Sequence, residues 1–522
     1  MKAMNWTSVA AMTVFVSVLL PVAVTAQNNS TQKLSAKHHH YQLVQIPTLG
    51  GFQTNFFDSA NNVGVLNNRG AVSGGSSDTL LPDPYSPSYW WEPDGTVTHG
   101  FIWQNGSLTD LGSLPGNNNS AATWISTNGT VVGYSENGQI DPSVPDLPEF
   151  SAVTWRDGKI TDLGNLPGGG YESSAVSVNS RGEVAGVATN LVPDANSLAP
   201  YNSDLWFFVP YGYQTRAFIW TKKSGMQDLG TLGTGTNAQA IAINERGEVI
   251  GDSYTSSEPG ACNAWGQGPL ATGAFIWDRD HGMVDLGGFG GTCTMALGLN
   301  NGGQVIGQSN VAGDGYARAF LWQNGSLRDL GGSLGGNGTS AIVINERGDV
   351  AGTASLPGEI TIHATLWRYG RKMTDLGTVG TDPCSIAHGL NEKGQVVGDS
   401  TPSDCVQFDT SRPFLWENGS MADLNALIPA NSPLSLVWAY SINERGEIAV
   451  NGFDVNGFEQ GALLIPCDEN HPGVEGCDYS PVDARIVAET AVPRYVFSGA
   501  QRRSQSRQAN RPHASSLLPT GR

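Results

Sequence analysis

The chain has 522 residues, 67 of them Gly, with only 14% charged residues and a net charge of −19. A Gly share well above the usual ~7% and a charged share below the usual ~25% favour short strands joined by tight turns over long helices. The acidic balance argues against nucleic acid as the main partner, because binding to phosphates requires Lys and Arg.

The N-terminus has the pattern of a signal peptide. Lys2 precedes an apolar run from Val9 to Val24, which is followed by small residues up to Ala26 and is short for a membrane span. We therefore expect residues 1–26 to be a signal peptide and the mature protein to be secreted or periplasmic, with no transmembrane segment. Residues 27–40, which include His38, His39 and His40, are expected to form a polar linker.

A repeat of four short motifs fills residues 41–466. Its clearest copy contains Arg216-Ala-Phe-Ile-Trp220, Gln227-Asp-Leu-Gly230, Ala240-Ile-Ala-Ile-Asn244 and Glu248-Val-Ile-Gly251. Each copy offers four strands in about 45 residues, the size of a propeller blade. The chain starts with the second half of a repeat and ends with a first half at Ala462–Ile465. These features predict an all-β fold, a β-propeller of about eight four-stranded blades closed by pairing of the N- and C-terminal half-repeats, with seven blades as the alternative.

Turn signals separate the connections between the expected strands into two groups. Asn-Glu-Arg-Gly and spacers such as Gln323-Asn-Gly325 predict tight hairpins, which we expect on one face of the ring. The longer segments then lie on the opposite face. We assign those that follow Leu-Gly-Gly to the middle of each blade, and the insertions at residues 76–99, 190–215 and 253–272 to the connections between blades.

Six cysteines fit an oxidising compartment. The face assignment favours sequential pairing, as Cys262–Cys293, Cys384–Cys405 and Cys467–Cys477. No two of the cysteines have the C-x₂₋₄-C spacing of a zinc half-site. Beyond the repeats, residues 467–522 are expected to form a small Cys loop followed by a disordered basic tail, which carries Arg494, Arg502, Arg503, Arg507, Arg511 and Arg522.

At these motifs the sequence resembles the HAF family of extracellular repeat proteins, which takes its name from a His-Ala-Phe tripeptide. The resemblance covers roughly residues 41–466 and rests on Ala-Phe-x-Trp, Asp-Leu-Gly, Ile-Asn-x-x-Gly and Val-x-Gly. No repeat spells the full tripeptide, the nearest being Arg216-Ala-Phe218 and His363-Ala-Thr365. The resemblance implies bacterial export and a repeat architecture, and it supplies no catalytic residues.

Residues that recur in every blade are predicted to build the blades. The Asp-Leu-Gly aspartates are expected to accept backbone N–H bonds at the strand ends, with calcium binding around a channel as the alternative. The Trp that ends one strand of each repeat is expected to fill space between blades. The aspartates are Asp110, Asp162, Asp228, Asp285, Asp329, Asp375 and Asp423, the last in the variant Asp-Leu-Asn. The tryptophans are Trp103, Trp155, Trp220, Trp277, Trp322, Trp367 and Trp416.

Aromatic residues in the three insertions are the candidate ligand-binding residues. Aromatic rings can stack on sugar rings while nearby carboxylates and amides bind the sugar hydroxyls, and binding residues often lie on loops held by a rigid scaffold. The alternative is a small satellite core that stabilises the loops. The candidates are Tyr89, Trp90, Trp91, Tyr201, Trp206, Tyr211, Tyr213 and Trp265.

These observations predict a secreted, monomeric binding module with no cofactor or metal, whose partner is a polysaccharide or surface glycan. One alternative is a polysaccharide-active enzyme, a glycosidase or lyase, that uses two carboxylates on the long-loop face. Another is a scaffold that docks a second exported protein. Known nucleophile, zinc-protease and phosphate-loop motifs are missing from the sequence, so no catalytic residue is assigned. The carboxylates considered are Glu92, Asp94, Asp141, Asp146, Glu149 and Asp204.

Overall fold

The fold is described from a computed structural model. The chain divides into two units, Met1–Ser35 and Ala36–Arg522, and the described residues all belong to the second unit. These are residues 37–56, 64–83, 96–115, 119–140, 148–194, 196, 212–262, 269–369, 372–402, 405 and 411–483. None of their helices is long and apolar enough to cross a lipid bilayer.

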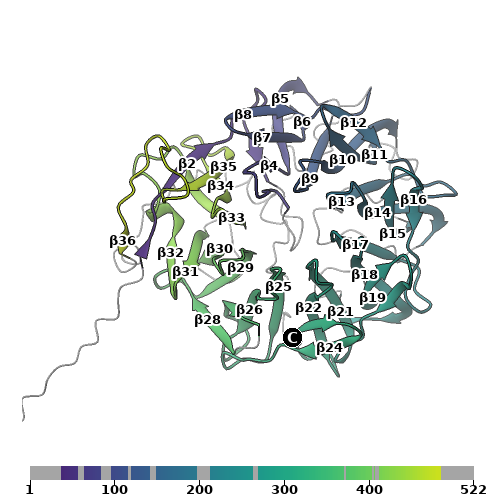
Figure 1. The fold of residues 1–522 in the computed structure, drawn as a ribbon. Coiled ribbons are helices and arrows are strands. Elements are labelled where there is room, and N and C mark those ends of the chain that lie inside the picture. The colour runs from purple at the N-terminus through teal and green to yellow at the C-terminus, as the bar shows by residue number, and fades with distance from the viewer. Residues whose placement is uncertain are drawn as a thin grey trace, which may run out of the picture. The chain divides into compact units, whose positions relative to one another are not determined.

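The described strands form eight antiparallel blades, numbered I–VIII in chain order, which Figure 1 shows arranged as a ring. Blades II–VII each contain four consecutive strands, from the innermost to the outermost. Blade II has β9 (Ser120–Ile125), β10 (Val131–Ile140), β11 (Pro148–Arg156) and β12 (Lys159–Asp162). Blade III has β13 (Ser173–Val178), β14 (Val184–Pro193), β15 (Tyr213–Thr221) and β16 (Gly225–Asp228). Blade IV has β17 (Ala238–Ile243), β18 (Val249–Pro259), β19 (Leu270–Asp278) and β20 (Gly282–Asp285).

The second half of the ring repeats this plan with shorter strands. Blade V has β21 (Gly290–Leu299), β22 (Val305–Val311), β23 (Ala317–Gln323) and β24 (Ser326–Asp329). Blade VI has β25 (Thr339–Ile344), β26 (Val350–Ser355), β27 (Ile362–Trp367) and β28 (Met373–Gly377). Blade VII has β29 (Cys384–Leu390), β30 (Val396–Thr401), β31 (Arg412–Glu417) and β32 (Ser420–Asp423), followed by the 3-10 helix η3 (Leu424–Ala426).

The two ends of the chain meet in blade VIII and close the ring. Its three inner strands are β33 (Ser435–Ile442), β34 (Ile448–Phe453) and β35 (Glu459–Pro466), and its outermost strand is the N-terminal β2 (Tyr41–Gln45). β2 pairs with β35 from Tyr41↔Pro466 to Gln45↔Ala462. The predicted closure by the two ends is therefore present, with three strands from one end and one from the other.

Blade I is the least regular of the eight. It contains β4 (Val72–Ser73), β7 (Phe101–Gln104) and β8 (Ser107–Asp110), with a bridge between Leu66 and Val72 on the inner side. The hairpin of β5 (Ser76–Pro82) and β6 (Thr96–His99) rises from it. Through β3 (Thr54–Asn55), this hairpin joins the sheet of blade VIII.

The boundary between blades differs from the predicted one. The strand that ends in Trp is the third strand of a blade, and the strand that follows Leu-Gly-Gly is the first strand of the next blade. The insertions after Val-x-Gly therefore lie inside blades, between the second and third strands, and the Leu-Gly-Gly segments connect blades. The assignment of the insertions to inter-blade connections was wrong, because length alone does not tell two long connections apart. Both kinds of long connection still lie on the same face, which we call the long-loop face. The opposite face, formed by the tight turns, is the turn face.

A belt of asparagine side chains joins the blades at the turn face. Asn345 is typical: its Oδ1 accepts the N–H groups of Arg347 and Asp349 in its own turn, and its Nδ2 donates to the carbonyl of Asn391 in the next blade, at 3.2 Å. The same bond to the next blade is made by Asn67, Asn179, Asn244, Asn300, Asn391 and Asn443. In blade II the corresponding bond is made by Asn128, which donates to the carbonyl of Ser180 in blade III. The belt therefore crosses every junction, including the one where the chain ends meet.

We expect Asn345→Ala to lower the free energy of unfolding by about 3 kcal/mol, because it leaves two turn N–H groups and one inter-blade carbonyl unsatisfied in a buried place. Urea unfolding measures this change. Arg347→Ala in the same turn is the control. The Arg347 side chain is half exposed and pairs with the buried Asp349 and, at 3.5 Å, with the partly exposed Glu392 of the next blade. Because water screens such half-exposed pairs, its loss should cost less than about 1 kcal/mol. Equal losses for the two variants would argue against the belt.

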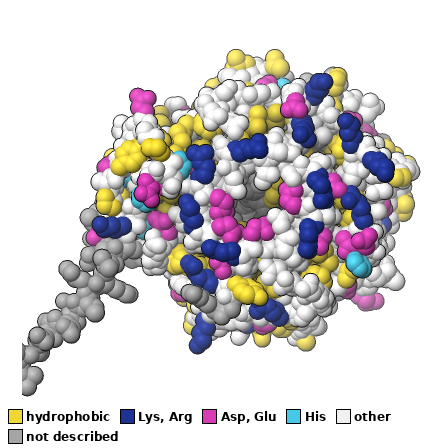
Figure 2. All heavy atoms as spheres, viewed as in Figure 1, with side chains coloured by type: hydrophobic (Ala, Val, Ile, Leu, Met, Phe, Trp, Pro, Cys, Tyr) yellow, Lys and Arg dark blue, Asp and Glu magenta, His cyan; other side chains and the backbone are white. Residues whose placement is uncertain are grey.

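The residue that follows the belt asparagine makes a further contact between blades at several junctions. The backbone N–H of Glu346 donates to Glu392, and that of Glu392 donates to Glu444. Burial, together with the neighbouring Glu392, raises the pKa of both Glu346 and Glu444. Figure 2 shows acidic side chains at the rim of the central hollow on this face, with Lys and Arg side chains farther out.

The structure confirms the structural interpretation of the recurring residues. The Oδ1 of Asp110 accepts the N–H of Gly112 at 2.7 Å, and five other Asp-Leu-Gly aspartates make the same bond. They lie on the outermost strands, so they do not surround the channel as the calcium alternative required. Trp103, Trp155, Trp367 and Trp416 are buried in clusters that join neighbouring blades.

The described part of the chain begins at Lys37, and residues 37–40 of the predicted linker belong to the folded unit. β1 (Lys37–His38) pairs with β36 (Val482–Asp483), and the buried His38 Nδ1 lies 3.1 Å from Glu417 Oε1. Sequence reasoning placed His38 in a solvated linker because its partner lies 379 residues away. The third disulfide, Cys467–Cys477, closes the small loop between β35 and β36.

Candidate ligand-binding face

Blades I–IV carry hairpins that project from the long-loop face. They are formed by β5–β6, β10–β11, β14–β15 and β18–β19, and we call them together the hairpin wall. In β10, β14 and β18 the first residues are buried and the last three are exposed. Each of these strands has a bulge before its last pair, as between Glu136 and Ile140. Blades V, VI and VIII have short turns in this place, at residues 312–316, 356–361 and 454–458. The long-loop face therefore has projecting hairpins over blades I–IV and only short turns over blades V, VI and VIII.

The base of each projecting hairpin is fixed by a residue of the next blade. Asn119, which precedes β9, accepts the N–H of Thr98 in β6 at 2.9 Å and donates to Asp83 at 3.3 Å. Glu172, which precedes β13, accepts the N–H of Phe150 in β11 at 2.7 Å. Asn237 precedes β17, accepts the N–H of Thr215 in β15 at 2.7 Å and donates to Asp194 at 2.8 Å. We call these three residues the clamp residues.

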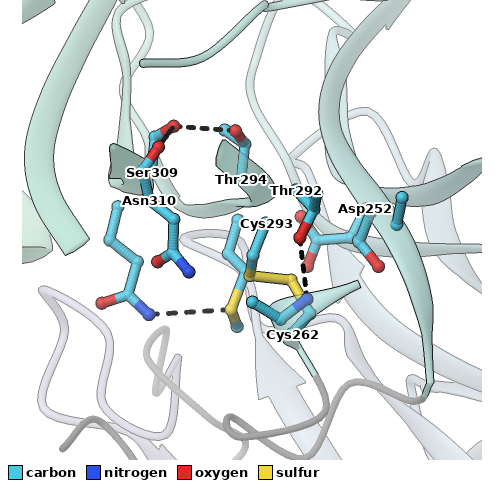
Figure 3. Close-up of a disulfide and its surroundings, with 12 residues drawn as sticks. Asp252, Cys262, Thr292, Cys293, Thr294, Ser309 and Asn310 are labelled. Atoms are coloured by element: carbon cyan, nitrogen blue, oxygen red, sulfur yellow. Dashed lines mark hydrogen bonds between the residues drawn. A yellow bond between two sulfur atoms is a disulfide. The ribbon is translucent and has the colours of Figure 1, made fainter. Parts of the chain in front are cut away.

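In blade V the equivalent position is occupied by Cys293, and a disulfide to Cys262 takes the place of the hydrogen bond. Figure 3 shows this disulfide with Thr292, whose hydroxyl accepts the N–H of Ala261 at 2.9 Å. Both cysteines are buried. The second predicted pair, Cys384–Cys405, is also present and lies within blade VII. The long-loop face is thus held in place by hydrogen bonds and by covalent bonds.

Large apolar side chains are exposed on this face. Leu80 is 74% exposed and Leu81 59%, at the end of β5, and Phe52, which is 52% exposed, stacks on Phe458 with ring centres 5.1 Å apart. Isolated exposed apolar residues are ordinary, but a gathering on one face is typical of an interaction site. The other exposed apolar residues of this face are Ile140, Leu191, Val192, Ile360 and Val455.

Of the predicted binding residues, only Tyr213 lies among the described residues. It packs edge-on against Tyr171, with ring centres 5.1 Å apart, and both rings remain partly exposed. Tyr171 belongs to the connection between blades II and III, where no sequence signal pointed to it. The remaining predicted residues lie outside the described residues: Tyr89, Trp90, Trp91, Tyr201, Trp206, Tyr211 and Trp265.

The buried carboxylates of Asp83 and Glu136 accept hydrogen bonds from the same amide group at the base of the hairpin wall. Sequence reasoning did not predict this contact. Asn119 Nδ2 donates to Glu136 Oε1 at 2.9 Å and to Asp83 Oδ2 at 3.3 Å, so one amide bridges blades I and II. Glu149, the one enzyme candidate among the described residues, accepts from Asn137 at 3.3 Å. The remaining enzyme candidates, Glu92, Asp94, Asp141, Asp146 and Asp204, lie outside the described residues.

A further carboxyl group lies beneath the hairpin of blade IV, beside the Cys262–Cys293 disulfide (Figure 3). Asp252 is fully buried, its Oδ1 accepts the N–H of Ala296 at 2.9 Å, and its Oδ2 has no hydrogen-bond partner among the described residues. Burial raises the pKa of Asp252 to about 7, although the hydrogen bonds from Ala296 and Gln239 act in the opposite direction. This carboxyl is therefore largely neutral below pH 7.

The protein is therefore an eight-bladed β-propeller whose long-loop face carries the hairpin wall. No protein-family model matches the chain, and no curated protein is similar to it. Among solved structures, the chain is similar to TolB from Acinetobacter baumannii, with 10% identity over 82% of this chain and 96% of that one and a TM-score of 0.30. It is similar to Porphyromonas gingivalis dipeptidyl peptidase 4, with 10% identity over 81% and 65% and a TM-score of 0.38. It is also similar to Pyrococcus horikoshii acylaminoacyl peptidase, with 8% identity over 66% and 52% and a TM-score of 0.37, and spans about half the length of that protein.

Proposed function

We propose that the protein is a secreted binding module that holds an extracellular polysaccharide against the hairpin wall. The observation that carries the proposal is the asymmetric face: four hairpins project on one side, each is fixed at its base, and apolar side chains are exposed beside them. A rigid base with variable loops is the usual arrangement of a binding surface. The resemblance to the HAF family, the N-terminal signal pattern and the three disulfides support export.

The polysaccharide is chosen as ligand because of the residues that the hairpins carry. The segments between the wall strands contain Tyr89, Trp90 and Trp91 in blade I and Tyr201, Trp206 and Tyr211 in blade III. Aromatic rings with nearby carboxylates and amides suit sugars, whose C–H faces stack while their hydroxyls form hydrogen bonds. Tyr213 and Tyr171 bring two further rings to the base of the blade III hairpin.

The proposal is tested by binding of the protein to a panel of soluble and insoluble polysaccharides, with release of reducing sugar measured in the same samples. Binding without release is the expected result. Release of sugar would instead indicate a polysaccharide-active enzyme. If no polysaccharide binds but another exported protein does, the scaffold alternative replaces this proposal.

We expect the double variant Trp90→Ala, Trp91→Ala to lose polysaccharide binding by at least about tenfold, because stacking of a ring on an aromatic side chain contributes roughly 1 kcal/mol or more. The melting temperature should stay within a few degrees of the unsubstituted protein. Tyr369→Ala is the matched control, because Tyr369 is an exposed aromatic residue in the tight turn between β27 and β28, on the turn face. Loss of folded protein in the double variant would support the satellite-core interpretation of the loop aromatics.

A further inference from the structure

Positive and negative charges are divided between the two faces of the propeller. The Lys and Arg residues of the described chain gather at the tight turns, and Figure 2 shows them spread over the turn face around the central hollow. Carboxylates neutralise many of them, as in the pairs Arg246–Glu248 at 2.7 Å and Arg279–Glu183 at 2.6 Å. The residues concerned are Arg69, Arg156, Lys159, Arg181, Lys222, Lys223, Arg246, Arg279, Arg347, Arg368, Lys372, Lys393 and Arg445.

We call the half of the propeller that carries the long-loop face the long-loop half. It has few positive side chains, and most of them form ion pairs with carboxylates. Arg216 pairs with Asp228 at 2.9 Å, Arg318 with Asp329 at 3.0 Å and Arg412 with Asp382 at 2.9 Å. Arg328 lies on the outer edge strand β24. Within the described residues, no Lys or Arg pairs with the following carboxylates of this half: Asp162, Glu258, Asp285 and Asp314. Among the described residues, the net negative charge therefore lies mainly on this side.

The stretches of sequence that link the wall strands, and those between β30 and β31, have the same bias in their composition. The segments at 84–95, 141–147, 195–211, 263–268, 403–404 and 406–410 contain no Lys or Arg. Their acidic residues are Glu92, Asp94, Asp141, Asp146, Asp204, Asp404 and Asp409. A surface of one sign attracts ligands of the opposite sign and repels those of its own sign, more strongly at low salt.

From this division of charge we infer that the polysaccharide held by the long-loop face carries positive charge, as in a polymer of amino sugars with free amino groups. The inference rests on the proposed function and names the chemical class of its ligand. Protonated amines can pair with the unpaired carboxylates, and they also interact favourably with Tyr and Trp rings. Polymers of uronic acids or phosphates would meet a surface of their own sign and are excluded.

The decisive experiment uses two oligosaccharides with the same backbone. Chitosan oligosaccharide carries free amines, which are protonated at mildly acidic pH, and chitin oligosaccharide of equal length has the same sugar rings with the amines acetylated. We expect the protein to bind chitosan oligosaccharide at least about tenfold more tightly in low salt. This preference should shrink as the salt concentration rises toward about 1 M, where the Debye length falls to about 3 Å.

Variants then separate the charge of the face from the total charge of the protein. The face variant combines Asp162→Asn, Glu258→Gln and Asp285→Asn, which removes three exposed carboxylates of the long-loop half. The control variant combines Asp157→Asn, Asp280→Asn and Glu475→Gln, which removes three exposed carboxylates of the turn side. The net charge of both proteins changes equally. We expect the face variant to bind chitosan oligosaccharide about fivefold to tenfold more weakly, because an exposed charge pair contributes roughly 0.2–1 kcal/mol. The control should bind within about twofold of the unsubstituted protein.

The outcomes distinguish this inference from the proposed function. Equal binding of the two oligosaccharides, or binding of a uronic acid polymer, would leave a polysaccharide-binding module but overturn the positive ligand. Equal weakening by the two sets of substitutions would also overturn it, since total charge would then be the cause. If no polysaccharide binds and a basic protein does, both the inference and the proposed function fall. Should the face variant fold poorly, its three substitutions are made singly and each is compared with one substitution of the control variant.

Discussion

A chain that begins at Pro47 is expected to be less stable than the full chain by more than about 5 kcal/mol and to unfold at ordinary temperature. It lacks β2, the outermost strand of blade VIII, and with it the pairing that closes the ring. Tyr41 and Ile46 are buried at the two ends of this strand, and each such side chain contributes about 1.5–3 kcal/mol. The backbone bonds from Tyr41 to Leu427 and from Ile46 to Gly461 are lost as well. A typical domain is stable by only about 5–15 kcal/mol.

The matched control is a chain that begins at Ala36. It removes the predicted signal peptide and most of the predicted linker but keeps β1, β2 and the contact of His38 with Glu417. Its melting temperature should equal that of the chain beginning at Gln27. Thermal unfolding followed by circular dichroism compares the three proteins. If the chain from Pro47 melts at the same temperature as its control, closure by β2 does not stabilise the ring.

Asp252→Asn is expected to stabilise the protein in alkaline solution and to have little effect in acid. The pKa of Asp252 is about 7 in the folded protein, against 3.8 for the ordinary group. The folded state thus holds its proton more tightly than the unfolded state, so this carboxyl favours folding fully below pH 4. That contribution is lost as the pH rises from about 4 to about 7, and the total loss is about 4 kcal/mol. Asn removes the titration and therefore the loss.

The measurement is the free energy of unfolding in urea at about pH 5 and about pH 8. The advantage of Asp252→Asn over the unsubstituted protein should grow by about 3 kcal/mol between these two conditions. Neutral side chains occupy the equivalent position in other blades. Gln308 in blade V and Asn451 in blade VIII stand where Asp252 stands in blade IV. An advantage that is the same at both pH values would show that Asp252 does not titrate between them.

Asp399 is the matched control for this substitution. It occupies the equivalent position in blade VII, and its Oδ1 accepts the N–H of Ala439 at 3.0 Å, as Asp252 does with Ala296. Its Oδ2, however, lies 3.1 Å from His388 Nε2. Asp399→Asn removes the partner of a largely buried histidine, so we expect it to destabilise the protein. The two substitutions should therefore have opposite signs in alkaline solution.

The blades could be predicted from the sequence because each is specified locally. Asn345 to Gly348 forms a tight turn through its own hydrogen bonds, and the spacer Asn324-Gly325 has the positive φ angles that a two-residue hairpin needs. Closure was visible too, because a repeat divided between the two ends needs a partner at each end. The turns depend on residues within a few positions of one another, and closure on counting the repeats.

The boundary of each blade and the clamp residues could not be predicted in this way. The strand after Leu-Gly-Gly could pair with the strands before it or with those after it in the sequence. Packing between blades decides this, as in the contact of Thr123 with the carbonyl of Ala175. Asn119, Glu172 and Asn237 share a position but not a residue type, and at this position Cys293 has the same role. Similar contacts made by different residue types leave no repeated motif in the sequence.

Because of the clamp residues, the tips of the hairpins can change during evolution without changes to the blades. Each hairpin is fixed at its base by a contact with the next blade. The segments beyond the base differ greatly in length, from 312–316 in blade V to 195–211 in blade III, while the blade beneath keeps the same strand order. Descendants of such a protein can exchange or lengthen a tip without rebuilding the ring, so recognition can diversify quickly on a conserved frame. The same property makes the four wall hairpins suitable sites for grafting foreign loops.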